Sequence, residues 1–95
     1  MCVAIAGGIK GIESRYLSLA EKHGMKCKLF NQKVPDLDKK IENVGAVILF
    51  TNTVSHKMAR VCCETCRRRG ICLKRIHSSS LNQLERALME IKSDL

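Results

Sequence analysis

The sequence predicts one small α/β domain of Rossmann-like or flavodoxin-like type over residues 1–95. Four short apolar runs alternate with four segments of helical periodicity, and the connections between them are short. One of these runs is continuously apolar, as in a strand covered on both faces. This order favours a parallel sheet with right-handed crossovers and helices on both faces. We expect a four-stranded sheet with strand order 2-1-3-4.

Each of the first two predicted strands leads into an amphipathic segment. The strand at 3–7 (VAIAG) precedes a helix that ends near His23 and Gly24, where glycine can form a left-handed C-terminal cap. The strand at 27–31 (CKLFN) precedes a helix that starts near Pro35. The residues spaced for the buried faces of these helices are Ile12, Tyr16, Leu17, Ala20, Leu37, Ile41 and Val44.

The second half of the chain repeats this order. The continuous apolar run is 46–50 (AVILF), and the helix predicted over 54–69 ends in a basic turn followed by glycine. A strand at 71–76 (ICLKRI) then leads to a helix capped by Ser79 or Ser80. The apolar positions of these two helices are Val54, Met58, Val61, Cys62, Thr65, Leu81, Leu84, Leu88, Ile91 and Leu95.

Composition restricts where the chain acts. No apolar run approaches the roughly 18 residues of a membrane span, and the N-terminal residues lack the pattern of a signal peptide, so we expect a cytoplasmic protein. In a reducing cytosol the six cysteines are expected to be thiols rather than disulfides.

The formal charge of +8 permits binding to nucleic acid, anionic metabolites or an acidic partner. Only three aromatic residues occur, which argues against the stacking platforms of single-strand binders. A solvated basic edge is the simpler interpretation of the main cationic cluster, and a nucleic-acid contact is the alternative. This cluster consists of Arg67, Arg68, Arg69, Lys74 and Arg75.

Ligands of such sheets lie beyond the carboxyl ends of the strands where strand order reverses, here between the first and third strands. The first strand ends in a glycine turn with Gly7, Gly8 and Gly11, which allows close backbone approach and free N–H groups directed at an anion. A dinucleotide is not favoured, because the second strand ends in Asn31 and no acidic residue is there to bind a ribose.

The third strand exits into the densest group of polar side chains in this crevice, Thr51, Asn52, Thr53, Ser55 and His56. We expect Thr53 to cap the next helix while Thr51 and Asn52 turn the chain. His56 falls in the first helical turn, where the helix dipole favours a neutral imidazole. Such an imidazole can hydrogen-bond a ligand or bind a metal.

A single CxxC motif, Cys63 to Cys66, could join Cys72 and His77 in a zinc-like set, although zinc usually takes its pair from a tight knuckle rather than a helix. Haem iron or another transition metal bound by His56 or by these cysteines is a further alternative. No carboxylate pair or nucleophile–base pair is visible, so the sequence does not favour an enzyme.

The chain resembles the bacterial domain-of-unknown-function family numbered 2325. The resemblance rests on four stretches: VAIAGG after residue 2, T-x-x-VSH from Thr51 to His56, the basic cysteine-bearing helix ending R-R-G-I, and SSSLxxLxxAL from Ser78 to Leu88. The chain departs from the family pattern at Asn31-Gln32-Lys33, where we expect a histidine or aspartate with glycines in many relatives. The resemblance implies a small Rossmann-like fold, self-association, no established catalytic activity, and haem or metal binding through histidine in some relatives.

These observations predict a non-enzymatic ligand-binding or regulatory module that takes a small anionic ligand or cofactor. The expected site consists of Gly7, Gly8, Gly11, Thr51, Asn52, Ser55 and His56. The alternatives are a haem or metal protein using His56, Cys63 or Cys66, and a basic nucleic-acid adaptor. We also expect a homodimer, because the sheet has two edges and the end of the chain is rich in apolar residues. These are Ile71, Leu73, Ile76, Leu81, Leu88 and Leu95.

Overall fold

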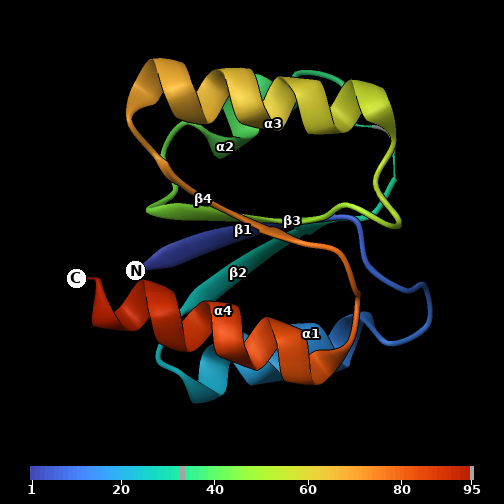
Figure 1. The fold of residues 1–95 in the computed structure, drawn as a ribbon, viewed down its shortest axis with the longest axis vertical. Helices are drawn as coiled ribbons and strands as arrows, with labels where there is room; N and C mark the ends of the chain where they lie inside the picture. The colour runs from blue at the N-terminus through green and yellow to red at the C-terminus, as the bar shows by residue number, and fades with distance from the viewer. Residues whose placement is uncertain (33, 95) are drawn as a thin grey trace.

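Four parallel strands form one sheet in the order β2-β1-β3-β4, which confirms the predicted α/β topology. The computed structural model describes residues 1–32 and 34–94. Strands and helices alternate along the chain (Figure 1). Their bounds are β1 Cys2–Ala6, α1 Glu13–Lys22, β2 Lys26–Phe30, α2 Leu37–Ile41, β3 Ala46–Phe50, α3 His56–Arg69, β4 Cys72–Ile76 and α4 Leu81–Ser93.

The sheet separates two helical layers. α1 and α4 cover one face, and α2 and α3 cover the other (Figure 1). All five residues of β3 are buried, as its continuous apolar sequence predicts. Alternate residues of the central strands therefore enter two separate cores, with Ile48 and Phe50 facing α1 and α4 while Val47 and Leu49 face α2 and α3.

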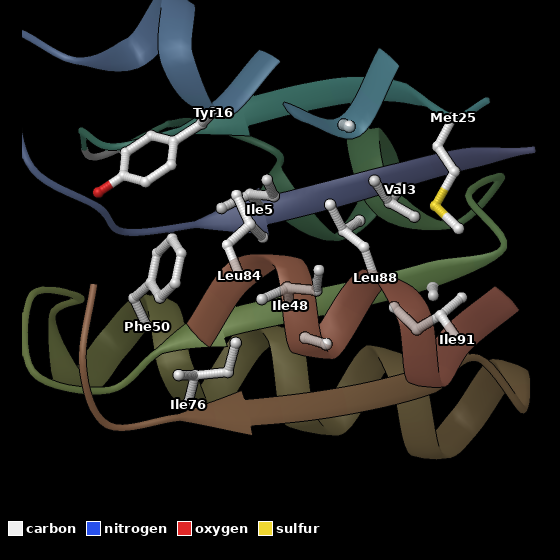
Figure 2. Close-up of a cluster of buried hydrophobic side chains, with 13 residues drawn as sticks. Val3, Ile5, Tyr16, Met25, Ile48, Phe50, Ile76, Leu84, Leu88 and Ile91 are labelled. Carbon is white, nitrogen blue, oxygen red and sulfur yellow. The ribbon is translucent and has the colours of Figure 1, made fainter. Parts of the chain in front are cut away.

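The core between the sheet and helices α1 and α4 contains an aromatic contact between two residues that are far apart in the sequence. Tyr16 of α1 and Phe50 of β3 pack with ring centroids 5.4 Å apart. Figure 2 shows the Tyr16 hydroxyl directed away from the aliphatic side chains around Ile5, Leu84 and Leu88. A buried phenol needs a hydrogen-bond partner, so this hydroxyl connects the core to the loops at the strand ends.

The helix ends follow local chemistry, with two corrections to the sequence-based prediction. α3 begins at His56 rather than residue 54, and its N-cap is Ser55, whose hydroxyl accepts from the Met58 N–H at 3.2 Å. Thr53 was therefore the wrong capping residue, because its hydroxyl is engaged in a different contact. Gly70 ends α3 in the left-handed conformation, as predicted, and Ser80 caps α4.

Most of the predicted apolar stripe positions are buried or partly buried. Leu17 is the exception in α1, since it is 40% exposed on the outer surface. Leu95, also predicted to be apolar and packed, lies outside the described residues. No helix in the described part of the chain is long and apolar enough to cross a membrane.

Candidate functional site

The glycine turn after β1 lies against the loops that follow β3 and β4. Gly7 and Gly8 have φ values of +93° and +108°, in the left-handed region. A Cβ atom on Gly7 would lie 2.8 Å from Thr53 Oγ1, and one on Gly8 would lie 2.9 Å from Tyr16 Cε2. Glycine is thus required here by close approach of the protein to itself, whereas a Cβ atom on Gly11 would meet no atom within 4 Å.

The N–H groups of this turn donate inside the protein. Gly8 N–H donates to Thr53 Oγ1 at 2.7 Å, and Ile9 N–H donates to the Tyr16 hydroxyl at 3.0 Å. Gly11 N–H donates to Glu13 Oε1 at 2.7 Å. The expectation of free N–H groups at these positions was wrong, because side chains of α1 and of the loop after β3 accept from them.

Glu13 supplies a carboxylate where an external anion was expected. Its second oxygen accepts from Asn31 Nδ2 at 2.9 Å, so the side chain connects the glycine turn to the end of β2. Hydrogen bonds from its own N–H, then from Gly11 and Asn31, lower the pKa of Glu13. The carboxylate is therefore held ionised at the first turn of α1, where the helix dipole also favours negative charge.

Thr53 begins a chain of hydrogen bonds across three loops. Its Oγ1 accepts from Gly8 and lies 3.1 Å from Ser79 Oγ, which in turn donates to Asn52 Oδ1 at 2.7 Å. The Tyr16 hydroxyl donates to the Ser79 carbonyl at 2.7 Å. Ser79 is buried, so each of its polar atoms needs such a partner. This network fixes the loops after β1, β3 and β4 to one another.

Sequence reasoning missed Tyr16, Ser79 and Glu13 as members of this region. Tyr16 and Ser79 are 63 residues apart, so no local spacing indicates their contact. The available signal was the phenol itself, since a tyrosine on a buried stripe needs a polar partner at its far end.

The remaining predicted residues lie on the exposed side of the network. Ser55 and His56 are exposed at the start of α3, and no acidic residue occupies its first turn. Within the described residues, the His56 side chain makes no hydrogen bond or ion pair. Thr51 and Asn52 are also exposed, and Thr51 Oγ1 donates to the Ile76 carbonyl at 3.3 Å.

Three of the hollows formed by the described residues lie away from these side chains. The largest, about 490 Å³, lies between the segment around α2 and the outer side of α3, from Lys57 to Arg68. The second, about 350 Å³, lies beside β4 and α4, and the third, about 340 Å³, lies beside Arg15 and Leu81. None of the three is lined by the predicted ligand-binding residues.

The cysteines divide by burial. All six are free thiols, and burial, followed by neighbouring thiols, raises the pKa of Cys62 to about 12 and that of Cys66 to about 11. Cys63 is partly exposed, and its sulfur accepts from Arg75 Nη2 at 3.2 Å. In the described chain, no group of three or more His, Cys, Asp or Glu side chains is arranged to hold a metal.

The basic residues near the end of α3 do not form one continuous surface. Arg69 pairs with Glu42 at 2.7 Å. Lys74 lies within 3.4 Å of Asp94 of the α4 C-terminus, whereas Arg75 contacts Cys63 of α3. Because successive strand residues point to opposite faces, β4 separates Lys74 from Arg75.

Comparison with known proteins identifies a family but no characterised relative. A family model described as "Uncharacterized protein conserved in bacteria (DUF2325)" matches residues 2–91. No curated protein and no solved structure matches the chain. The match covers every helix and strand except the end of α4.

Proposed function

This chain belongs to the uncharacterised bacterial family DUF2325, and we propose that it is a non-enzymatic ligand-binding or regulatory module. Its site lies beyond the carboxyl ends of β1 and β3 and takes a small anionic ligand or cofactor. The position follows the general rule for open parallel sheets, in which ligands bind where strand order reverses. The order β2-β1-β3-β4 reverses between β1 and β3.

The proposal rests on one observation: a hydrogen-bonded group of polar side chains lies next to the exposed N-terminus of α3. Thr53, Ser79 and Asn52 are joined by hydrogen bonds, and Asn52 is positioned by the bond that its Oδ1 accepts from Ser79. Its amide nitrogen can still donate outward. Next to it, α3 begins at His56 without an acidic residue in its first turn, which leaves the positive end of the helix dipole for an anion.

Some of the predicted site residues shape the crevice, and the others contact the ligand. Gly7 and Gly8 allow the turn after β1 to approach Thr53 and Tyr16, and thus form the wall of the site. Gly11 N–H is held by Glu13, so the turn shapes the crevice rather than donating to the ligand. The contacts with the anion come from the other side, through Thr51, Asn52, Ser55 and His56.

Isothermal titration with inorganic phosphate and with phosphate-bearing metabolites tests the site. The variant His56→Ala should weaken binding at least tenfold if the imidazole makes the specific contact. His77→Ala is the matched control, because His77 is also exposed but follows β4. Equal binding by the wild type and His56→Ala would remove His56 from the site.

A second candidate function is haem or transition-metal binding through His56. The observation that favours it is an exposed imidazole without a hydrogen-bond partner among the described residues, since imidazole is a common ligand of iron, copper and zinc. A visible spectrum of purified protein with added haem tests this alternative. A Soret shift that His56→Ala abolishes supports it, and an unchanged free-haem spectrum rejects it. Cys63 and Cys66 are secondary ligand candidates, to be tested by the same spectrum with serine variants.

We further propose a cytoplasmic homodimer. Free thiols at all six cysteines fit a reducing compartment, where disulfides do not persist. Both edges of the four-stranded sheet, at β2 and β4, are also unpaired in the described chain. Self-association is the common solution for a small domain with exposed edges or apolar faces.

A further inference from the structure

β4 forms one edge of the sheet, and its backbone directions can be assigned. The Ile76 carbonyl accepts from Thr51 N–H at 2.8 Å, so the backbone groups of Ile76 face β3. Backbone direction alternates along a strand, which places the N–H and C=O groups of Leu73 and Arg75 on the open side. The sheet order leaves this side without a neighbouring strand in the described chain.

A groove of about 350 Å³ runs beside this edge. Lys74 and Arg75 of β4 line it together with Gln83 and Arg86 of α4, and Glu90 is its acidic member. Lys74 is already engaged by Glu90 and Asp94, at 3.6 and 3.4 Å. Neither Arg75 nor Arg86 forms an ion pair with any described residue. The groove therefore has the Arg86 guanidinium available to an anionic partner, and the Arg75 guanidinium is available on the α3 face of the same edge.

Arg75 is held by a weak acceptor. Its guanidinium donates to the Cys63 sulfur at 3.2 Å, and a thiol is a poor acceptor compared with a carboxylate. Little binding free energy is therefore lost when Arg75 leaves the Cys63 sulfur for a carboxylate. The side chain lies on the same strand whose backbone groups face outward, so one partner can use both.

We propose that the open edge of β4 binds an extended acidic peptide segment of another protein, which adds to the sheet as a further strand. The outward backbone groups of Leu73 and Arg75 form the ladder, and this ladder requires a peptide backbone. A residue of the added strand opposite Arg75 projects to the same face and lies close enough for its carboxylate to pair with the guanidinium. Alternate residues on the other face meet Arg86.

Charge argues against the other occupants of this edge. Two β4 strands related by a two-fold axis must pair antiparallel. Such pairing brings together the Lys74 and Arg75 segments of two chains that each have a formal charge of +8, so like charges would repel. A nucleic acid satisfies the guanidinium groups but offers no ladder to the N–H and C=O groups of the edge. An acidic peptide satisfies both sets of groups.

Amide NMR titration with a capped peptide of alternating threonine and glutamate tests the proposal. The backbone resonances of Leu73 and Arg75 should shift, and their amide exchange should slow, because these groups enter the ladder. Arg75→Gln should weaken binding roughly threefold to fivefold, since it removes charge but keeps the N–H. Arg75→Pro should abolish binding, because it removes the outward N–H as well.

Two peptide controls keep the test independent of how the variants fold. On the wild-type protein, a peptide methylated at every amide nitrogen should bind far more weakly, and a threonine–lysine peptide should not bind. Equal binding of the methylated peptide would overturn the ladder, and equal binding of the lysine peptide would overturn the charge argument. A short DNA duplex that shifts these resonances when the acidic peptide does not would also overturn the proposal.

Discussion

Gly8 and Gly11 both have a positive φ angle but differ in their surroundings. Their φ values are +108° and +100°, so alanine is strained at either position. Only Gly8 also meets a neighbour, since its Cβ atom would lie 2.9 Å from the Tyr16 ring. We expect Gly11→Ala to lower the free energy of unfolding by about 1 kcal/mol, and Gly8→Ala by roughly 1–3 kcal/mol more. Urea denaturation measures the difference, and equal losses would contradict the packing at Gly8.

Thr53 serves the fold through its hydroxyl rather than through a helix cap. Thr53→Val removes the acceptor that lies 2.7 Å from the Gly8 N–H. It also removes the hydrogen bond between the Thr53 and Ser79 hydroxyls. We expect a loss of about 1 kcal/mol in the free energy of unfolding. Thr53→Ser keeps the hydroxyl and should recover most of it. Thr51→Val is the control, because that hydroxyl makes a single, longer contact of 3.3 Å and should contribute about 0.5 kcal/mol.

At the scale of single elements, α3 depends on Ser55 for its start. The Ser55 hydroxyl accepts from the Met58 N–H, so Ser55→Ala should cost about 1 kcal/mol while Ser55→Asn retains the cap. Amide hydrogen exchange locates the effect, because the Met58 amide should exchange faster in Ser55→Ala and remain protected in Ser55→Asn. Unchanged exchange in Ser55→Ala would show that the cap is dispensable.

The elements themselves could be predicted from periodicity and breakers, whereas the contacts between loops could not. The continuous apolar run predicts a buried strand at β3, and the glycine after α3 predicts the end of that helix. Both predictions need only neighbouring residues in the sequence. Thr53 and Ser55 are both good capping residues by local chemistry. Their roles are distinguished by the Gly8 N–H, which lies 45 residues from Thr53 along the chain. The same limit applies to the N–H groups of the glycine turn, whose acceptors Thr53 and Tyr16 are brought in by tertiary packing.

For the whole molecule, the buried thiols predict a loss of stability at alkaline pH. Burial raises the pKa of Cys27 and Cys62 to about 12 and that of Cys66 to about 11, from an ordinary value of 9.0. Above that ordinary value the unfolded chain loses thiol protons that the folded chain keeps, so unfolding becomes more favourable as pH rises. Each thiol contributes a slope of up to about 1.4 kcal/mol per pH unit.

Urea denaturation at a series of pH values above about 8 measures this slope. Cys62→Ala should reduce the slope, although it also lowers stability at neutral pH through the cavity it leaves. Cys66→Ala should reduce the slope in the same way, because burial raises the pKa of that thiol too. A flat dependence of stability on pH in the wild type would show that these thiols ionise freely in the folded protein.

The apolar surface available for a dimer differs from the one predicted from the sequence. Ile76 and Leu88 were expected to need a partner subunit, but both are buried within the single chain. The exposed large apolar side chains of the helices are instead Leu17 of α1, 40% exposed, and Met89 of α4, 55% exposed. α1 and α4 pack together on one face of the sheet (Figure 1). This layer is therefore the better candidate for a two-fold interface.

A dimer through α1 and α4 also agrees with the charge distribution. Two chains of formal charge +8 repel, so the interface should be apolar and distant from the basic end of α3, which lies on the opposite face of the sheet. Light scattering over a dilution series should give a dimer mass that Met89→Lys shifts towards the monomer. Ile9→Lys should not, because Ile9 is 49% exposed but lies in the loop after β1. A monomer mass that persists at high micromolar concentration in moderate salt would refute the dimer, whereas a dimer unaffected by Met89→Lys would exclude only the α1–α4 interface.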